Sequence, residues 1–207
     1  MLVIIDYNLG NLQSVQSGFE KIGLPCVISR NKEIIEKADA LILPGVGSFS
    51  VAMENLARYD LIDLIRARVK AGVLLLGICL GMQILFEKGY ENGETLGLGL
   101  IKGTVEPIVT DEKLPHMGWN QLHILQQKHP LVKNLVENDE VYFVHSYQAN
   151  CKDENIIAVT DYGQARIPAI VSHQRVLGCQ FHPEKSSRIG QLILQAFKAM
   201  IEEKVEV

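Results

Sequence analysis

One stretch in the first half of the chain decides the fold: Val73-Leu74-Leu75-Leu76-Gly77-Ile78-Cys79-Leu80-Gly81-Met82-Gln83. It opens as a short, wholly apolar run, which is typical of a strand buried on both faces of a parallel sheet. Beyond the Gly-x-Cys-x-Gly segment, the spacing of residues 80–88 predicts a helix. A strand, a tight turn flanked by glycines and a helix form the layout of a nucleophile elbow. We therefore expect Cys79 in a crowded turn that requires glycine on both sides.

Two interpretations of Cys79 stay open on this stretch alone. The start of a helix exposes backbone N–H groups and the positive end of the helix dipole, and both favour thiolate over thiol. In that setting Cys79 is a nucleophile. Buried cysteines are also common as inert core residues, and the five-residue pattern does not separate the two interpretations.

A candidate base lies far downstream. A cysteine nucleophile needs a base, and the base needs an orienting group. Residues 176–181 predict a strand that delivers His182 to its carboxyl end, where sites in α/β sheets lie. Pro183 favours extended backbone at His182. If Glu184 is extended too, both side chains point to the same face, so the carboxylate can hold the imidazole that faces Cys79.

The elbow and the His-x-Glu pair together predict a Cys79–His182–Glu184 triad. His145 is the rival base, because it follows a run that looks buried. It has no carboxylate two residues away, so His182 is preferred.

These motifs resemble the class I, triad-type glutamine amidotransferases, and more closely the HisH branch of that family. The elbow and Phe-His-Pro-Glu mark the superfamily, whereas Pro-Gly-Val-Gly, Pro-His-Met-Gly-Trp-Asn and His-Ser-Tyr are specific to the branch. The resemblance covers the whole chain. It is carried by Asp6-Tyr7-Asn8-Leu9-Gly10-Asn11-Leu12 with Ser14-Val15, Pro44-Gly45-Val46-Gly47, residues 77–83, Pro115-His116-Met117-Gly118-Trp119-Asn120, Phe143-Val144-His145-Ser146-Tyr147 and residues 180–186.

The resemblance implies hydrolysis of L-glutamine to L-glutamate and ammonia. Cys79 would attack the carboxamide, His182 would activate the thiol and protonate the leaving ammonia, and Glu184 would fix the imidazole tautomer. No metal and no organic cofactor are implied, and the six histidines show no metal-ligand spacing. The ammonia would pass to a HisF-type (β/α)8 cyclase subunit, the partner in a heterodimer of histidine biosynthesis.

The Gly45-Val46-Gly47 turn is a candidate oxyanion hole, together with Leu80 after the nucleophile. Acyl transfer puts negative charge on the amide oxygen, and one backbone N–H aimed there stabilises it by roughly 3–4 kcal/mol. Glycines on both sides of Val46 would let its peptide rotate, and the resemblance implies that the N–H is supplied only when this peptide flips. A plain turn at a strand end is the alternative.

Further residues are predicted to bind the substrate. The resemblance implies that Gln83 contacts the bound glutamine, and Tyr142 and Ser146 are expected to reach either the glutamine or the partner. The predicted partner-facing residues are Asn8, Gly10, Asn11, Trp119, Asn120 and Lys185. A lone Trp is usually core packing, and a polar loop is often merely solvated. Glu106-Pro107 stands where a basic and an aromatic residue are expected, and nothing in the sequence explains it.

Composition limits the remaining choices. The chain has 207 residues, of which 47% are hydrophobic. This length and composition predict a single α/β domain that spans residues 1–207. A net charge of −4 without a basic stripe argues against nucleic acid as the main partner. The four cysteines have no paired spacing, so we expect reduced thiols and a cytoplasmic protein. The longest apolar run, near Cys79, is too short to cross a bilayer, so no membrane association is expected.

The rest of the pattern predicts a flavodoxin-like, mostly parallel sheet with helices on both faces and a mixed β extension. Helices are expected at residues 11–22, 31–38, 48–55, 60–71, 80–88 and 187–204, and a frayed tail at 202–207. Strands are expected at residues 2–5, 25–29, 40–43, 73–76, 140–147 and 176–181. Residues 97–172, rich in glycine and β-branched residues, predict the extension, with a hairpin of residues 156–162 and 167–173.

Two other functions remain open. A HisH paralogue could feed a different synthase, for example one that makes an amidine on a surface sugar, and it would keep every motif above. The other class is a non-catalytic partner-binding subunit or a cysteine hydrolase that works alone. The intact triad argues against the former, and the branch-specific docking motifs argue against the latter.

Overall fold

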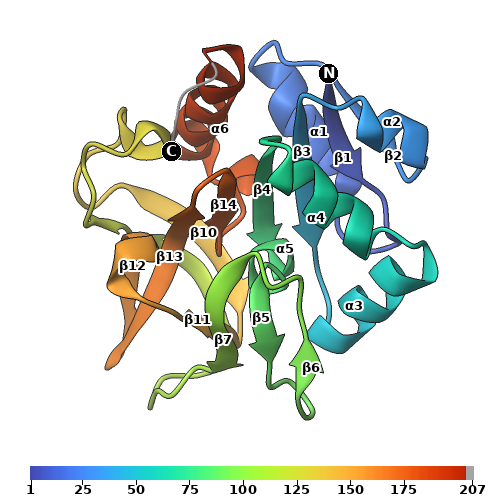
Figure 1. Cartoon of the computed structure of the whole chain (residues 1–207). Coiled ribbons are helices and arrows are strands. Elements are labelled where there is room, and N and C mark those ends of the chain that lie inside the picture. Colours follow the sequence, from blue (N-terminus) through green and yellow to red (C-terminus); the bar gives the residue numbers. More distant parts are fainter. Residues whose placement is uncertain (204–207) are drawn as a thin grey trace.

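An eight-stranded sheet with helices on both faces organises the computed structural model, which describes residues 1–203 (Figure 1). Its order is β2-β1-β3-β4-β14-β13-β12-β9. The first five strands are parallel, in the order of a flavodoxin-like sheet, and the last three are antiparallel. The predicted fold class is therefore confirmed. The strands are β1 (Leu2–Ile5), β2 (Cys26–Ser29), β3 (Ala40–Gly45), β4 (Leu74–Cys79), β9 (His123–Ile124), β12 (Ile156–Tyr162), β13 (Ala165–His173) and β14 (Val176–Cys179).

Alternate residues of the central strands feed two separate cores. Ile4 and Ile42 face α1 and α6, where they pack with Phe19. Ile5 and Leu41 face α2, α3 and α4 on the opposite side. This period-two pattern is what a strand buried on both faces produces. The helices are α1 (Leu12–Lys21), α2 (Lys32–Glu36), α3 (Phe49–Arg58), α4 (Ile62–Lys70), α5 (Leu80–Gln83) and α6 (Ser187–Glu202).

The β extension is built differently from the prediction. Only β9, β12 and β13 join the main sheet, and two smaller sheets pack beside it. One is four-stranded and mixed, in the order β11-β7-β5-β6, and the other is the antiparallel pair β10-β8. Their strands are β5 (Phe86–Gly89), β6 (Thr95–Leu96), β7 (Ile101–Pro107), β8 (His116–Gln121), β10 (Glu140–His145) and β11 (Tyr147–Asn150), and three short 3-10 helices are η1 (Pro130–Val132), η2 (Asp153–Asn155) and η3 (Pro183–Lys185).

The helix expected at residues 80–88 is wrong beyond its first turn. Helix α5 ends at Gln83, and Phe86 begins β5, which pairs with β6 and β7. Ile84, Leu85 and Phe86 are all fully buried, so their spacing carries no information about one buried face. Pairing with β7 then decides the conformation of this segment.

The single strand expected at residues 140–147 is two strands. β10 ends at His145 and pairs with β8, whereas β11 begins at Tyr147 and pairs with β7. Ser146 is the joint between the two sheets. The end of the helix expected at residue 204, and most of the expected frayed tail, lie outside the described residues. Within residues 1–203, no helix is long and apolar enough to cross a membrane.

Candidate active site

Cys79 sits at the junction of β4 and α5 with a left-handed backbone, φ 55° and ψ −114°. This conformation is rare for a residue with a side chain and persists only where the surroundings impose it. A Cβ on Gly81 would lie 1.7 Å from the carbonyl oxygen of Leu43, and one on Gly77 would lie 2.6 Å from that of Gly81. The expected crowding at the elbow, with glycine required on both sides, is therefore present.

The helix-dipole argument for the thiol does not hold in the structure. Helix α5 has only four residues, so it carries little of the macrodipole of a full helix. Cys79 is 7% exposed, and its Sγ lies 3.7 Å from the carbonyl oxygen of Val144. Activation of this thiol therefore depends on neighbouring side chains.

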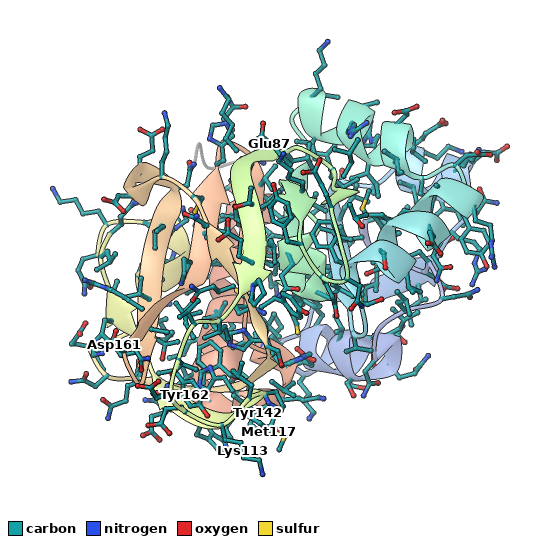
Figure 2. All side chains as sticks on the ribbon, turned by 90° about the horizontal axis from the view of Figure 1, so that it is seen from below. Glu87, Lys113, Met117, Tyr142, Asp161 and Tyr162 are labelled. Carbon is teal, nitrogen blue, oxygen red and sulfur yellow. The ribbon has the colours of Figure 1, made fainter. Side chains whose placement is uncertain are left out.

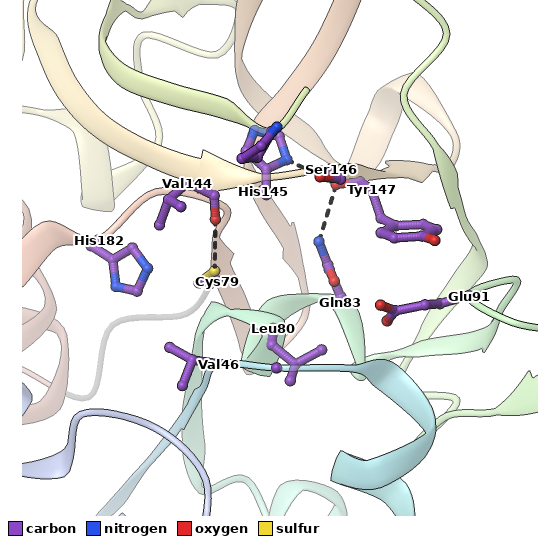
Figure 3. A pocket seen from close by; sticks show the side chains of 12 residues that line it. Val46, Cys79, Leu80, Gln83, Glu91, Val144, His145, Ser146, Tyr147 and His182 are labelled. Carbon is purple, nitrogen blue, oxygen red and sulfur yellow. Dashed lines mark hydrogen bonds between the residues drawn. The ribbon is translucent and has the colours of Figure 1, made fainter. Parts of the chain in front are cut away.

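His182 lies next to that thiol, in the loop after β14 (Figure 3). Its Nδ1 is 2.8 Å from Oε1 of Glu184, and both side chains are almost fully buried. The predicted pair is present. His182 has the extended backbone expected before Pro183, with φ −101° and ψ 95°, but Glu184 lies in the 3-10 helix η3 and not in extended chain. The turn brings the carboxylate back to the imidazole two residues earlier.

The backbone of His182 is fixed by two groups. Its N–H donates to the carbonyl oxygen of Tyr142, 3.0 Å away. Ser186 donates from Oγ to the carbonyl oxygen of His182 at 2.7 Å and accepts from the N–H of Tyr142 at 3.0 Å. Strand β10 therefore sets the position of the imidazole relative to Cys79.

The surroundings of His182 favour its protonated form. Burial lowers the pKa of the imidazole, but hydrogen bonding and charge at Cys79 and Glu184 outweigh burial and raise the pKa to about 9. Nδ1 is bonded to Glu184, so Nε2 is the nitrogen available to Cys79. A proton leaving the thiol thus has a nearby acceptor that the carboxylate stabilises once it is charged.

A cavity of about 370 Å³ opens in front of these two residues, which is within the range of small-molecule sites (Figure 3). It is lined by Val46, Gly47, Cys79, Leu80, Gln83, Glu91, Pro115, Val144, His145, Ser146, Tyr147 and His182. Within residues 1–203, no group of three or more His, Cys, Asp or Glu side chains is arranged to hold a metal ion.

The turn after β3 forms one wall of the cavity. Gly47 has φ +107°, and a Cβ there would meet no atom nearer than 4.0 Å, while Val46 is 41% exposed. Pro44, just before this turn, is held in place because the buried Tyr7 hydroxyl donates to its carbonyl oxygen at 2.6 Å. Leu80 opens α5, so its N–H is not needed within the helix. Of the four predicted oxyanion-hole residues, Val46, Gly47 and Leu80 line the cavity, whereas Gly45 does not.

Comparison with known proteins places the chain in a family. The family model for "Glutamine amidotransferase class-I" matches residues 3–199. The imidazole glycerol phosphate synthase subunit HisH of Lactococcus lactis subsp. lactis (strain IL1403) is 62% identical over 95% of this chain and 96% of its own length. The chain belongs to the HisH family of class-I glutamine amidotransferases. The HisH subunit of Bacillus subtilis (strain 168) is 47% identical over 99% of this chain and 98% of its own length.

Solved structures support the fold of this HisH-family chain. One described as a glutamine amidotransferase superposes with a TM-score of 0.76 at 22% identity and covers 97% of this chain and 98% of its own. A chain of PurLQS from Thermotoga maritima gives 0.76 at 20% identity, covering 99% of this chain and 98% of its own. The resemblance inferred from the motifs is thus confirmed, both for the family and for the fold.

Two of the three predicted substrate-binding residues of this amidotransferase line the cavity. Gln83 donates from Nε2 to the carbonyl oxygen of Tyr147 at 3.1 Å and to Oε1 of Gln180 at 3.0 Å. Both hydrogens of its amide are used, so Gln83 offers the cavity its Oε1, an acceptor. Ser146 also lines the cavity. Tyr142 is not part of the lining, and its ring packs edge-on against Trp119 at 6.1 Å.

Of the predicted partner-facing residues, four are exposed: Asn8, Asn11, Trp119 and Lys185. Trp119 is 51% exposed and Met117 on the same strand is 63% exposed. Figure 2 shows Met117 and Tyr142 on the same side of the molecule. Asn120 is half-buried and turned inward, where its Nδ2 donates to the carbonyl oxygen of Asp161 at 2.8 Å.

The remaining predicted partner-facing residues lie in the loop after β1. Asn8 has φ 65° and accepts on Oδ1 from Arg30 at 2.7 Å, so its side chain is already engaged. Asn11 caps α1 by accepting from the N–H of Ser14 at 3.3 Å. Gly10 packs against Pro44, so this loop touches the oxyanion turn. Contact of these residues with a partner stays a prediction.

Sequence reasoning missed Glu91 and Tyr147 in the cavity. Glu91 contributes the carboxylate of the lining, and its Oε2 accepts from the N–H of Phe49 at 2.8 Å. Glu91 was missed because a helix was expected at residues 80–88. The structure has strand β5 there instead, and the chain after β5 places Glu91 at the cavity. The break between β10 and β11 similarly turns Tyr147 toward Gln83.

Proposed function

We propose that this chain is the glutaminase subunit of imidazole glycerol phosphate synthase and hydrolyses L-glutamine to L-glutamate and ammonia. One observation carries the proposal: the buried His182–Glu184 pair and the strained Cys79 meet at the mouth of one cavity. A thiol, a base and a carboxylate that orients the base are the parts that acyl transfer needs.

The first half-reaction forms a thioester. Cys79 Sγ attacks the side-chain carboxamide carbon of glutamine, and its proton passes to Nε2 of His182. The developing oxyanion lies beside the Val46 turn and the N–H of Leu80, which stabilise its negative charge. His182 then protonates the amide nitrogen, the C–N bond breaks, and ammonia leaves.

Water completes the cycle. His182, now neutral, accepts a proton from water as the oxygen attacks the γ-glutamyl thioester. The C–S bond breaks, the thiolate takes the proton back, and glutamate departs. Glu184 bonds Nδ1 throughout, so Nε2 is the nitrogen that exchanges protons with the reactants.

The lining residues fit an amino-acid substrate. The Glu91 carboxylate is placed to pair with the α-ammonium group, and Gln83 presents an acceptor to the same cavity. Among the described residues that line this cavity, Glu91 is the only carboxylate, so it supplies the selectivity for a substrate with a positive charge.

The partner in this proposal is a HisF-type (β/α)8 cyclase subunit, which receives the ammonia in L-histidine biosynthesis. The HisH names of the relatives support it, as does the exposed pair Met117 and Trp119 near the site. Residues 1–207 act as one domain, and the four unpaired cysteines suit the reducing cytoplasm.

The test is glutamate release from glutamine by the full chain, with and without a HisF-type cyclase and its nucleotide ligand. Wild type should be active and stimulated by the loaded cyclase, and Cys79→Ala should lose at least about 10³-fold. Cys151→Ala is the matched control. Activity that needs Cys79 but ignores the cyclase points to the paralogue alternative. No Cys79-dependent release under any condition rejects the proposal.

A further inference from the structure

Two buried histidines lie outside the proposed triad and touch each other. His145 of β10 stands directly opposite His116 of β8 in the antiparallel register. His116 Nδ1 is 2.9 Å from His145 Nε2, and each residue is at most 6% exposed. Only His145 lines the cavity.

Hydrogen bonds continue from both ends of this pair. On the inner side, His145 Nδ1 is 2.8 Å from the carbonyl oxygen of Tyr147 (Figure 3). On the outer side, His116 Nε2 is 3.2 Å from Nδ2 of Asn120, which also bonds the carbonyl oxygen of Asp161. We name the series Asn120, His116, His145 and the Tyr147 carbonyl the histidine chain.

Each end of the histidine chain fixes the direction of every bond in it. A carbonyl oxygen only accepts, so His145 Nδ1 carries a hydrogen and donates to Tyr147. Asn120 uses its amide nitrogen toward the Asp161 carbonyl, so the same nitrogen donates to His116 Nε2. Both constraints give the same result: His116 donates from Nδ1 to Nε2 of His145. Both rings are therefore neutral Nδ1–H tautomers.

The histidine chain has no place for another proton. A proton on either ring would set two N–H donors face to face, at Asn120 or between the rings. The surroundings act in the same direction, because burial lowers the pKa of His116 and of His145 to about 4. His116 is also stacked between Phe143 and Tyr162, with ring centroids 4.8 and 4.1 Å away. The pair is thus built to be rigid and uncharged.

The inner end of the histidine chain holds a wall of the cavity. The Tyr147 carbonyl accepts from both His145 and Gln83, and Ser146 lies between the two bonded residues. Ser146 is also the joint where β10 ends and β11 begins, and its own carbonyl oxygen accepts from the N–H of Ile108 at 3.0 Å. Without the imidazole, the Tyr147 carbonyl keeps only the bond from Gln83, so one of the two side chains that orient this peptide toward the cavity is lost.

We propose that His116 and His145 are positioning residues that fix the Ser146–Tyr147 peptide and Gln83 for binding of glutamine. The inference rests on the proposed glutaminase function and deepens it by assigning part of substrate binding to groups that never touch the substrate. His116 does so through His145. The outer end of the histidine chain, Asn120, adjoins the exposed Trp119, so the same bonds connect the surface to the cavity wall.

The bond directions are tested without any activity measurement. Long-range ¹H–¹⁵N correlation spectra of the ¹⁵N-labelled full chain at neutral pH distinguish protonated from bare imidazole nitrogens. Both His116 and His145 should show a protonated Nδ1 and a bare Nε2. A protonated Nε2 on either ring overturns the histidine chain.

The positioning role is tested with two variants of one residue. His116→Asn can place an amide N–H where Nδ1 stands and still donate to His145, whereas His116→Gln reaches only the Nε2 position. In glutamate release with the cyclase, His116→Gln should raise KM for glutamine about tenfold with kcat within about threefold, and His116→Asn should recover most of the loss. His173→Gln, a histidine outside the histidine chain, is the control.

The outcomes separate the two proposals. A wild-type chain that releases no glutamate rejects the glutaminase function, whatever the tautomers are. Active wild type with unchanged KM in a folded His116→Gln variant overturns the positioning role alone. Equal losses in the Asn and Gln variants also overturn it, because they indicate a requirement for ring packing only. If His116→Gln does not fold, Asn120→Leu replaces it, with Asn120→Gln as its conservative partner.

Discussion

Two imidazoles line one cavity, and their pKa values are shifted in opposite directions. His182 lies between Cys79 and the Glu184 carboxylate, and hydrogen bonding and charge at both raise its pKa to about 9. His145 has a backbone carbonyl on one nitrogen and a second imidazole on the other, and its pKa is lowered to about 4. Both side chains are buried, so burial alone does not explain the difference.

The neighbour of each ring decides its role. A carboxylate stabilises the imidazolium, so His182 can take a proton in the reaction and return it. A hydrogen-bond series between fixed acceptors and donors leaves His145 neutral and unable to act as a base. A histidine that faces a cavity is therefore a base only if the group behind it stabilises the imidazolium and the nitrogen that faces the cavity can take up a proton.

The largest expected effect separates the two histidines by kinetics. His182→Asn removes the base, and kcat for glutamate release should fall about 10⁴-fold with little change in KM. His145→Leu removes only a support, so KM should rise while kcat falls no more than about tenfold. Steady-state assays with the cyclase measure both. Equal losses of kcat in the two variants would contradict the division of roles.

Glu184→Gln tests the carboxylate that makes His182 different. The amide cannot stabilise the imidazolium and can hold the wrong tautomer, so kcat should fall about 10³-fold. The imidazole pKa of His182, followed by NMR titration, should drop as well. Glu154→Gln, a change at an exposed carboxylate, is the matched control. A His182 pKa that does not move would show that Glu184 is not its source.

The free energy of unfolding at alkaline pH should depend on the protonation of His182. Its folded pKa of about 9 lies above the ordinary value of 6.5, so proton binding stabilises the fold. That contribution is complete below pH 6.5 and is lost as pH rises to about 9, and the free energy of unfolding should fall by about 3 kcal/mol. Urea denaturation between pH 6.5 and 9 measures this, and the slope should flatten in Glu184→Gln.

The free energy of unfolding at acid pH should depend on the protonation of His116 and His145. His116 and His145 have folded pKa values of about 4, below the ordinary 6.5, so the unfolded chain binds protons more readily. Their contribution is present above pH 6.5 and is lost as pH falls toward 4, by about 3 kcal/mol for each histidine. His116→Asn should make unfolding less sensitive to acid in this window. An unchanged slope would contradict the low pKa of His116.

The smallest expected effect concerns the rings around His116. Tyr162→Leu removes one stacked ring and the hydroxyl that donates to the carbonyl oxygen of Lys113, and should lower stability by about 2 kcal/mol. Tyr162→Phe keeps the ring and should lose only about 1 kcal/mol. Thermal unfolding measures both, and kcat should stay near wild type. If the two variants are equally destabilised, the stacking contributes nothing.

The parallel half of the fold could be predicted because its signals are local. Strands β1 and β4 are wholly apolar runs, and Cys79 between two glycines permits little besides a strained turn. The Asn31 cap of α2 follows the same local logic, since its side chain accepts from the N–H two residues on.

The β extension could not be predicted because it depends on distant pairing. Phe86 continues a fully buried segment, and only the partner strand β7 determines that it forms a strand. The same holds for the cavity. His116 and His145 become neighbours through the β8–β10 register, and nothing near either residue in the sequence announces the contact.

The His182–Glu184 contact was predicted for a reason that the structure replaces. Pro183 was expected to make His182 extended, and it does, but the assumed extended backbone of Glu184 is replaced by a 3-10 turn that begins at Pro183. Two residues that are two apart can make this contact in extended chain and in a 3-10 turn. The pair was therefore predicted correctly because a base needs an orienting carboxylate, and the assumed backbone conformation was not required.

The place of β14 in the sheet has a consequence for synthesis on the ribosome. It is the last strand of the described chain, yet it lies between β4 and β13, near the middle of the sheet. Until residues 176–182 have emerged, β4 has an open edge and Cys79 has no base. Such long-range closure is slow, and exposed edges promote association. A nascent chain is therefore inactive and vulnerable until its final segment docks, and only finished molecules consume glutamine.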